Sequence, residues 1–506
     1  MYKMKKAIRK ITIFSIIATF FVSCEDYIDV NKDPNSPEVS ELTPDNILPG
    51  AQTTTATTFG TRMNQLGNLM SVSWSANATD FTSPFINEFK YNVTTTFYDD
   101  IWDNLYQRTS NFSHIEKYQD GQNWDHHRAI AKIMKSFYFQ YLVDLYGDLP
   151  YTQIHNSTDF LFPKYDDDKA TYRLLITQLD DAINLIDNTD DTTVRSVVAF
   201  DVMMHGDMPK WKRFANTLKL RILLRQSQLA DADTQTYLTQ QFANLQNSGA
   251  QFLAANEDVT INPGYLNSDG KQNPFYATYG RDPQGDATST NNLVGPSKFT
   301  ADFLRGLLPG RSVVDPRRLR LYTSRTAGST TITGVAQGAS TGRPSRLGPA
   351  IIKGSNQDMI IMQSAESLFL QAEAAQRGYL AGNAQALFEN GINASFAILG
   401  STPTEAANYI TLSQGVNTVG WTGSANKIEA IITQKWIANN CINGIESWIE
   451  LTRTGFPSGM PLPLTTNSAT RPIRLLYPAS EYSGNTNNVP NQTAADAFTS
   501  PVFWDN

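Results

Sequence analysis

The segment 125–151 reads DHHRAIAKIMKSFYFQYLVDLYGDLPY and decides the class of fold. Its apolar side chains recur every three or four residues, at Ala129, Ile130, Ile133, Met134, Phe137, Tyr138, Tyr141, Leu142 and Leu145. This spacing predicts a helix over 125–145 with one buried stripe. Gly147 and Pro150 then predict its end, because glycine favours helix termini and proline lacks the backbone N–H that a continuing helix needs.

Helical periodicity continues on both sides of this segment. A second clear stripe lies in 172–186, where apolar residues fall at spacings of three and four. Further helices are expected at about 50–76, 97–119, 209–228, 234–247, 359–377, 382–398 and 425–452. Alternating strand patterns are scarce, so we predict a mainly α fold of tetratricopeptide-like helical hairpins. A clean period of about 34 residues is not present in the sequence.

Two long stretches interrupt the helical pattern. Residues 250–297 and 322–358 are rich in Gly, Ser, Thr, Asn and Pro. Long loops that leave a rigid helical frame commonly carry binding surfaces. We therefore expect these two loops to form a ligand face.

The first 23 residues have the composition of an export signal. Five basic and no acidic side chains accompany an apolar run over 11–22, and this run is shorter than the roughly 20 residues that cross a membrane. Ser23 and Cys24 then resemble a lipoprotein cleavage site. We expect residues 1–23 to be removed and Cys24 to carry anchoring acyl chains. An ordinary signal peptide is the alternative.

The composition changes again after Cys24. A polar, proline-rich stretch predicts a flexible tether over 24–45, which leaves 46–506 as a single domain. Loss of the five basic signal residues would change the net charge from −7 to −12, which argues against nucleic acid as a partner. With Cys24 acylated, Cys441 has no cysteine to pair with, so we expect it to be a buried, unreactive thiol.

Three consecutive aspartates, Asp166, Asp167 and Asp168, precede the helix expected at 172–186. Carboxylates at this position satisfy free backbone amides and favour the positive end of the helix dipole. We interpret them as capping residues, with a calcium site as the alternative.

Glu366 and Glu373 are the pair of carboxylates that most resembles a catalytic site, because seven residues place them on one helical face. Their backbones would lie about 10.5 Å apart, whereas retaining glycosidases separate their carboxyl groups by roughly 5–5.5 Å. The packed stripe around them favours ion pairing with cations such as Arg221 or Arg225. The five histidines lack metal-ligand spacing, and nucleophile and phosphate-loop motifs are absent from the sequence. We therefore expect no catalytic residue, metal or cofactor.

Sugar-binding surfaces combine flat aromatic rings with planar polar side chains. The stretch 265–282, expected to be non-helical, supplies both and is our first choice. The second choice is 68–81, where Trp74 accompanies Ser73, Asn77 and Asp80. The predicted ligand-binding residues are Trp74, Asn273, Tyr276, Tyr279 and Arg281.

A series of motifs spread over nearly the whole chain resembles the SusD/RagB family of nutrient-binding outer-membrane lipoproteins, in its SusD-like branch. The motifs are CEDYIDVNKDPN at 24–35, DLYGDLPY at 144–151, WKRFANTLKLR at 211–221, DPR at 315–317, SAESLFLQAEA at 364–374, ESW at 446–448, RTG at 453–455 and RLLYP at 474–478 with Glu481. Each motif alone is weak evidence for the family. All of them together, in this order along the chain, are specific for it.

The resemblance implies a non-catalytic protein with one α-helical domain and a loop-rich ligand face. Such a protein is lipid-anchored to the cell outer membrane, faces the extracellular side, and acts as the lid of a SusC-like TonB-dependent transporter. Its ligand would be an oligosaccharide or another nutrient, with peptide left open. A surface glycoside hydrolase and a helical scaffold that binds only protein are the rival readings.

Overall fold

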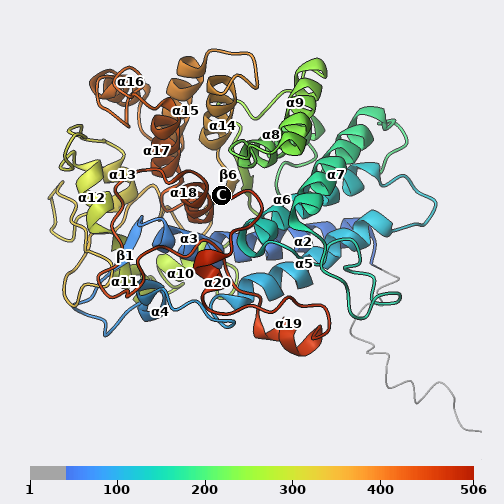
Figure 1. Cartoon of the computed structure of the whole chain (residues 1–506), viewed down its shortest axis with the longest axis horizontal. Helices are drawn as coiled ribbons and strands as arrows, with labels where there is room; N and C mark the ends of the chain where they lie inside the picture. The colour runs from blue at the N-terminus through green and yellow to red at the C-terminus, as the bar shows by residue number, and fades with distance from the viewer. Residues whose placement is uncertain (1–41, 506) are drawn as a thin grey trace, which may run out of the picture. The chain divides into compact units, whose positions relative to one another are not determined.

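Helices dominate residues 42–505, the part of the chain that the computed structural model describes (Figure 1). The mainly α fold expected from the sequence is confirmed. The expected signal peptide, Cys24 and most of the expected tether lie outside the described residues. From Pro44, where the first described helix begins, the chain forms one compact unit. Among the described helices, none is long and apolar enough to cross a membrane.

The helices fall into two groups along the chain, separated by residues 248–273. The first group is α2 (Pro44–Thr58), the π-helix η4 (Phe59–Met63), α3 (Asn64–Met70), α4 (Ile86–Lys90), α5 (Asp99–Lys117), α6 (Asp125–Tyr146), α7 (Asp168–Asn188), α8 (Met208–Arg225) and α9 (Ala232–Asn247). The second is α10 (Pro274–Tyr279), α11 (Ser289–Leu293), α12 (Lys298–Leu304), α13 (Arg318–Leu321), α14 (Ser364–Gln376), α15 (Ala384–Ile398), α16 (Pro403–Ser413), α17 (Lys427–Asn439), α18 (Gly444–Thr454), α19 (Ala479–Gly484) and α20 (Asp496–Thr499).

Six short strands form three two-stranded antiparallel sheets among the described residues. β1 (Trp74–Ala76) pairs with β3 (Val294–Pro296), β2 (Val259–Ile261) with β6 (Met359–Met362), and β4 (Tyr322–Thr323) with β5 (Arg346–Leu347). In the β1–β3 pair, Trp74 lies opposite Pro296 and Ala76 opposite Val294. The β1–β3 and β2–β6 sheets therefore tie a long loop to a distant part of the chain, while the β4–β5 sheet joins two parts of the loop 322–358.

α6 is the helix that the opening segment predicts. It packs against α5, α7 and α8, which lie beside it in Figure 1. The predicted apolar stripe is buried along its whole length, because α6 is covered on several sides by its neighbours. The helix ends at Gly147, whose φ of 76° is a conformation that glycine adopts without strain.

The aspartates before α7 have two different structural roles. Asp167 caps the helix, because its side chain accepts a hydrogen bond of 2.8 Å from the backbone N–H of Ala170. Asp166 accepts hydrogen bonds from the backbone N–H groups of Tyr151 at 2.8 Å and Thr152 at 2.7 Å. The capping interpretation is confirmed for Asp167, while Asp166 holds the preceding loop against the end of α6.

Two of the expected helices are interrupted in the structure. The helix expected over 359–377 begins only at Ser364, because residues 359–362 pair with β2 as a strand. The helix expected over 425–452 is two helices, α17 and α18. The chain turns between them at Cys441, whose φ of 67° is incompatible with a continuous right-handed helix.

Eight of the described helices lie where none was expected: α4, α10, α11, α12, α13, α16, α19 and α20. α10 occupies part of 265–282, so the expectation of a wholly non-helical loop there was wrong. α16 starts with a capping box in which the side chain of Thr402 and the side chain of Glu405 each accept from the other's backbone N–H. Pro403 at the first turn further favours this helix start.

α3 and α18 cross at two glycines. A Cβ atom added to Gly67 would lie 2.0 Å from the backbone carbon of Gly444, so any larger residue at Gly67 forces the helices apart. Asn64 reinforces this contact, because its Oδ1 accepts from the Gly444 N–H at 2.9 Å. The Oδ1 of Asn68 accepts from the Cys441 N–H at 3.0 Å. The α3–α18 crossing is therefore fixed by backbone contact and by polar groups.

Two apolar clusters fill the described unit. The first contains side chains from α2 and α5 to α9, and the second contains side chains from α12, α14, α15 and α17. Helices of both clusters contribute to a group of buried charged side chains, here called the buried-ion network. Its members are Asp144, Arg221, Arg225, Glu366, Glu373, Lys435, Glu446, Glu450 and Arg453.

Candidate functional site

Three segments that are distant in sequence meet around the β1–β3 sheet. The backbone N–H of Asn77 donates to Leu293 O at 2.7 Å, and that of Ala78 donates to Gly342 O at 3.0 Å. The N–H of Gly342 donates in turn to Thr79 Oγ1 at 2.9 Å. The two predicted loops and the second-choice segment thus form one surface. We call this surface, built from residues 77–90, 288–297 and 322–346, the loop face.

A pocket of about 450 Å³ opens in the loop face. Its lining includes the rings of Phe81 and Phe89, the side chain of Ile86, and hydroxyl groups of Thr79 and Ser340. Phe81 is half-buried, so part of its ring is accessible. An apolar ring beside hydroxyl groups matches the two needs of a sugar, which are stacking and hydrogen bonding. This loop-face pocket is the candidate binding site.

The chain around the pocket is held in strained backbone conformations. Among the described residues ten non-glycine positions have positive φ, and half of them fall between residues 72 and 98, at Val72, Ser83, Phe85, Tyr91 and Tyr98. Ser83 lines the pocket, and its φ is 47°. Such conformations cost of order 1–3 kcal/mol each and concentrate at binding sites. The strain therefore supports a functional role for this segment.

Polar side chains form a connected group on the loop face next to the pocket. The Nδ2 of Asn77 donates to Asp80 Oδ2 at 2.8 Å and to the carbonyl of Asn292 at 3.1 Å. Arg343 donates to Asp80 Oδ1 from Nη2 at 2.7 Å and from Nε at 3.0 Å. These hydrogen bonds from Asn77 and Arg343 lower the pKa of Asp80. Asp80 is therefore a carboxylate at neutral pH.

Trp74, the predicted aromatic residue of 68–81, does not face the pocket. Its side chain is completely buried, its Nε1 donates to Cys441 Sγ at 3.1 Å, and its ring contacts that of Tyr279 at a centroid distance of 5.2 Å. This burial argues against the predicted ligand contact of Trp74, because the buried strand β1 places its ring in the second apolar cluster. Phe81, at the end of the same segment, lines the pocket together with Phe89.

The predicted platform in 265–282 is divided between core and surface. Asn273 is buried and caps α10, because its Oδ1 accepts from the Tyr276 N–H at 2.9 Å. Tyr279 is 1% exposed, and its hydroxyl donates to Gln65 at 2.9 Å. α10 packs against η4, which explains why Tyr279 faces inward. The burial of Tyr279 argues against its predicted ligand contact. Asn273 lines a separate pocket of about 460 Å³, so its ligand role stays a prediction.

Tyr276 and Arg281 remain at the surface. Tyr276 is half-buried, and Arg281 is exposed with Nη1 donating to the carbonyl of Gly285 at 2.7 Å. Neither residue lines the loop-face pocket. Their predicted contact with ligand stays a prediction.

A second pocket of about 620 Å³ lies next to the loop-face pocket, and Ala336 lines both. Its lining includes Phe299, Leu308 and Leu462, which give it apolar walls. Arg311 also lines it, but its Nε donates to Thr418 at 2.9 Å and its Nη2 to Ser458. This pocket therefore offers fewer free polar groups to a hydroxyl-rich ligand.

The carboxylates that first suggested catalysis belong to the buried-ion network. Glu366 lies 3.0 Å from Arg221, which confirms that pairing. Glu373 accepts two hydrogen bonds of 2.8 Å from Arg453, which corrects the expectation that Arg221 or Arg225 would neutralise it. Burial, followed by the nearby Glu446, raises the pKa of Glu366. Burial alone would raise the pKa of Glu373, but Arg453 and Arg377 lower it.

Glu366 is 0% and Glu373 is 1% exposed. A polysaccharide cannot reach side chains with this burial. This pair therefore does not form a glycosidase site in the folded structure.

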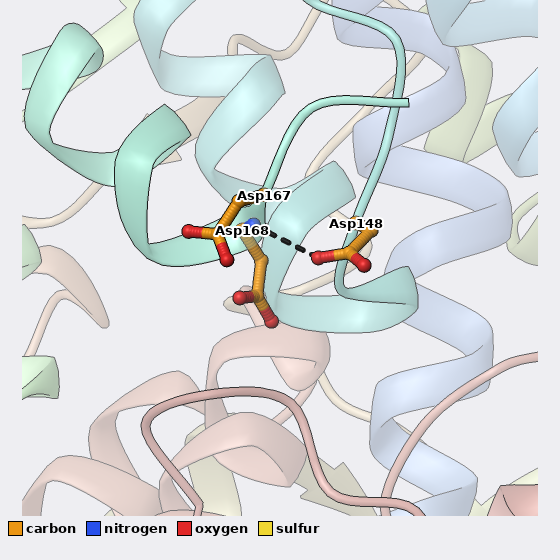
Figure 2. A group of neighbouring side chains, drawn as sticks. All are labelled: Asp148, Asp167 and Asp168. Carbon is orange, nitrogen blue, oxygen red and sulfur yellow. Dashed lines mark hydrogen bonds between the residues drawn. The ribbon is translucent and has the colours of Figure 1, made fainter. Parts of the chain in front are cut away.

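A group of three aspartates, Asp148, Asp167 and Asp168, brings carboxylate oxygens within 4.8 Å of one another. Figure 2 shows Asp148 facing the start of α7, where its Oδ1 accepts from the backbone N–H of Asp168 at 3.0 Å. The Oδ2 of Asp168 accepts from the Phe503 N–H at 2.9 Å. Burial raises the pKa of Asp168 to about 6. These carboxylates already accept backbone hydrogen bonds, so their arrangement is explained by the fold.

Comparison with known proteins gave one family and a set of solved structures. The model of a SusD-like family, described as starch-binding and associating with the outer membrane, matches residues 34–478. A search of the curated proteins found no match.

The solved structures share the fold at low sequence identity. A chitin-binding SusD homologue from Flavobacterium johnsoniae is 23% identical, with a TM-score of 0.72, 91% of this chain and 98% of that chain covered. A SusD-like protein from Bacteroides thetaiotaomicron is also 23% identical, with a TM-score of 0.71 and the same coverage. A SusD homologue from Bacteroides uniformis is 22% identical, with a TM-score of 0.67, 91% of this chain and 99% of that chain covered.

Proposed function

Because the chain belongs to the SusD-like family of starch-binding proteins that associate with the outer membrane, we propose that it binds a glycan in the loop-face pocket. The observation that carries this proposal is the meeting of three distant segments around one pocket that combines Phe81 with hydroxyl groups. The chitin-binding activity named for the Flavobacterium johnsoniae relative is consistent with a polysaccharide ligand.

The mode of binding follows from the chemistry of the pocket lining. The accessible part of the Phe81 ring stacks against the apolar face of a sugar ring. Thr79 and Ser340 line the same pocket, and their hydroxyl groups both donate to and accept from sugar hydroxyls. The protein holds the glycan without cleaving it. A peptide ligand is the alternative within this proposal.

The place of the protein in the cell is the second part of the proposal. Residues 1–23 act as a lipoprotein signal peptide, and Cys24 carries acyl chains that anchor the protein in the outer membrane with its body outside the cell. Residues 24–43 serve as the tether, because Pro44 and Asp45 already belong to α2, and the unit that begins at Pro44 serves as the glycan-binding domain. The protein then acts as the lid of a SusC-like TonB-dependent transporter, to which it delivers the glycan.

Calorimetric titration with maltohexaose and chitohexaose tests the binding site. Loss of one stacked ring costs on the order of 1 kcal/mol, so Phe81→Ala should weaken binding about fivefold to tenfold. Phe160→Ala is the matched control, because Phe160 is 39% exposed and is not part of the pocket. Equal affinities for the two variants would refute the pocket assignment.

A reducing-end assay separates binding from catalysis. Incubation of the purified protein with starch and chitin should release no new reducing ends. Release of reducing ends that persists after further purification of the protein would favour the alternative function, a glycoside hydrolase. Binding of a peptide library, with no binding of either hexasaccharide, would favour the peptide alternative.

A further inference from the structure

The loop face contains arginines that lack carboxylate partners. Arg325 Nη2 donates to the carbonyl of Asn292 at 3.0 Å, and Arg325 Nη1 donates to the side-chain oxygen of the same residue. Arg346 Nη2 donates to this side-chain oxygen at 3.3 Å. Because both arginines donate to one atom, their guanidinium groups lie next to each other. Within residues 42–505, neither forms an ion pair with a carboxylate.

Arg343 adds a third positive charge nearby. It pairs with Asp80 at 2.7 Å, in a pair whose side chains are 56% and 31% exposed. Burial lowers the pKa of Arg325, and the positive charges of Arg346 and Arg343 lower it further, while Asp80 opposes them. Three guanidinium groups therefore share one carboxylate. We call Arg325, Arg343 and Arg346 the arginine cluster.

The surplus of positive charge is local. The whole chain has a net charge of −7 at pH 7, and the arginines of the buried-ion network are all paired with carboxylates. Like charges placed side by side repel each other, so an unneutralised cluster costs stability unless a ligand supplies negative charge. The arginine cluster is thus an anomaly that the fold itself does not explain.

Hydrogen bonds connect the arginine cluster to the loop-face pocket. Asn77 bonds to Asn292, which both Arg325 and Arg346 contact, and to Asp80, which Arg343 contacts. Thr79, a pocket residue, lies between Asn77 and Asp80 in sequence and accepts from the backbone of Gly342. The three arginines do not line the pocket itself, so a ligand reaches their guanidinium groups by extending beyond the pocket across the loop face.

We propose that the glycan bound by the loop-face pocket is acidic and that the arginine cluster binds its carboxylate or sulfate groups. This inference rests on the proposed function and specifies the class of ligand. Arginine is suited to this role because its planar donors match a carboxylate or sulfate with two parallel hydrogen bonds. Arg346 is the best placed of the three arginines to bind the acidic group. Its side chain is exposed and makes one long hydrogen bond, so its other donors are available.

The test compares acidic and neutral oligosaccharides of equal length. Oligogalacturonate supplies carboxylates, chondroitin sulfate oligosaccharides supply sulfates as well, and maltooligosaccharides are neutral. The wild-type protein should bind at least one acidic probe tenfold or more tightly than the neutral probe at low salt. This preference should fall as sodium chloride is added, because salt screens charges at the surface.

Arg346→Gln should reduce the affinity for the acidic probe about tenfold and leave the affinity for the neutral probe within twofold. Lys212→Gln is the control. It also removes one positive charge, but from an exposed ion pair between Lys212 on α8 and Asp187 on α7. Circular dichroism of each variant checks that the fold is retained.

Two results would overturn the inference: equal affinity for acidic and neutral probes, or an acidic preference that Arg346→Gln leaves intact. If the acidic and neutral probes bind equally and Phe81→Ala weakens the binding of both, the acidic ligand is refuted while the proposed function stands. If no glycan binds under any condition, the proposed function fails with it.

Discussion

Arg225 and Glu446 form an ion pair of 2.8 Å in the interior, and both side chains are 0% exposed. Arg225 also lies 2.6 Å from Glu450 and 3.4 Å from Asp144. One guanidinium on α8 therefore meets carboxylates from α6 and α18. Burying charges is costly unless each has a partner, so this contact fixes how the helices must pack. The buried-ion network thus specifies the arrangement of the hairpins that support the loop face.

Replacing Arg225 with Met should destabilise the fold strongly. The change keeps an apolar side chain in place but leaves Glu446, Glu450 and Asp144 with less compensating charge. Removal of one partner from a buried pair costs roughly 3–5 kcal/mol, to be measured as the free energy of unfolding in urea. Lys298→Met is the control, because Lys298 pairs with Asp302 at the surface and should cost about 1 kcal/mol or less. A similar loss of unfolding free energy in both variants would contradict a special role for the buried-ion network.

The two tyrosines of α10 should respond differently to truncation. Tyr279→Ala should cost about 3–5 kcal/mol of unfolding free energy, because it leaves a cavity in the second apolar cluster and removes the hydrogen bond to Gln65. Tyr276→Ala should cost about 1 kcal/mol, since Tyr276 is only half-buried. Thermal and urea unfolding of the two variants measure this difference. The reverse order would show that α10 packs with its other face inward.

His155 should make the fold sensitive to mild acid. Burial lowers its pKa to about 4, the hydrogen bond to the Tyr106 carbonyl opposes this, and the charges of Lys135 and Lys117 add to it. An unfolded histidine titrates near 6.5, so the unfolded state binds the proton first as the pH falls. The contribution of neutral His155 to the free energy of unfolding is therefore fully present above about pH 6.5. It is lost as the pH falls from about 6.5 to about 4, at about 1.4 kcal/mol per pH unit.

The matched variant for this prediction is His155→Gln. It should be less stable than the wild type near pH 7, because the hydrogen bonds to Ser113 and Tyr106 are lost or weakened. Its stability should fall less steeply toward pH 5, since it has no group to protonate at this site. Asp168 has a raised pKa of about 6, so its protonation stabilises the fold as the pH falls, opposite to the effect of His155. Both proteins contain Asp168, so the difference between their slopes of stability against pH reports His155 alone. Parallel slopes would show that His155 does not titrate in this window.

Cys24→Ala should release the protein from the membrane. No described helix can cross a membrane, and the proposed attachment depends on acyl chains at Cys24. Fractionation followed by a high-salt wash should find the wild type in the membrane pellet and the variant in the supernatant. A variant that stays in the pellet would show that another segment or a tightly bound partner holds the protein there.

The long helices could be predicted because their signal is local. In α6 the apolar stripe, the stop at Gly147 and the length of the helix all follow from neighbouring residues. The break between α17 and α18 could not be predicted in this way. The segment has helical periodicity on both sides of Cys441, and the turn there is held by Asn68, which lies far away in sequence.

The loop-face pocket is lined in part by the second-choice segment 68–81, while no residue of the first-choice segment 265–282 lines it. The two loops and the segment 68–81 do meet on one surface. Burial of Trp74 and Tyr279 depends on contacts between distant segments, and an aromatic residue in a loop has the same sequence signal whether it points inward or outward. Arg325, Arg343 and Arg346 were missed because they come together only through Asn77 and Asn292.

The crossing of α3 and α18 has a mechanical consequence. The first three helical elements among residues 42–505, α2, η4 and α3, run without a break from Pro44 to Met70, and Gly67 meets Gly444 at the far end of this rod. A load applied at Pro44 would pull along the rod and would be resisted at its far end by a backbone contact flanked by hydrogen bonds from Asn64 and Asn68. Force entering at the N-terminal end would thus be transmitted directly to the C-terminal helices. We expect the α3–α18 crossing to bear this load, because it is the backbone contact at the far end of the rod.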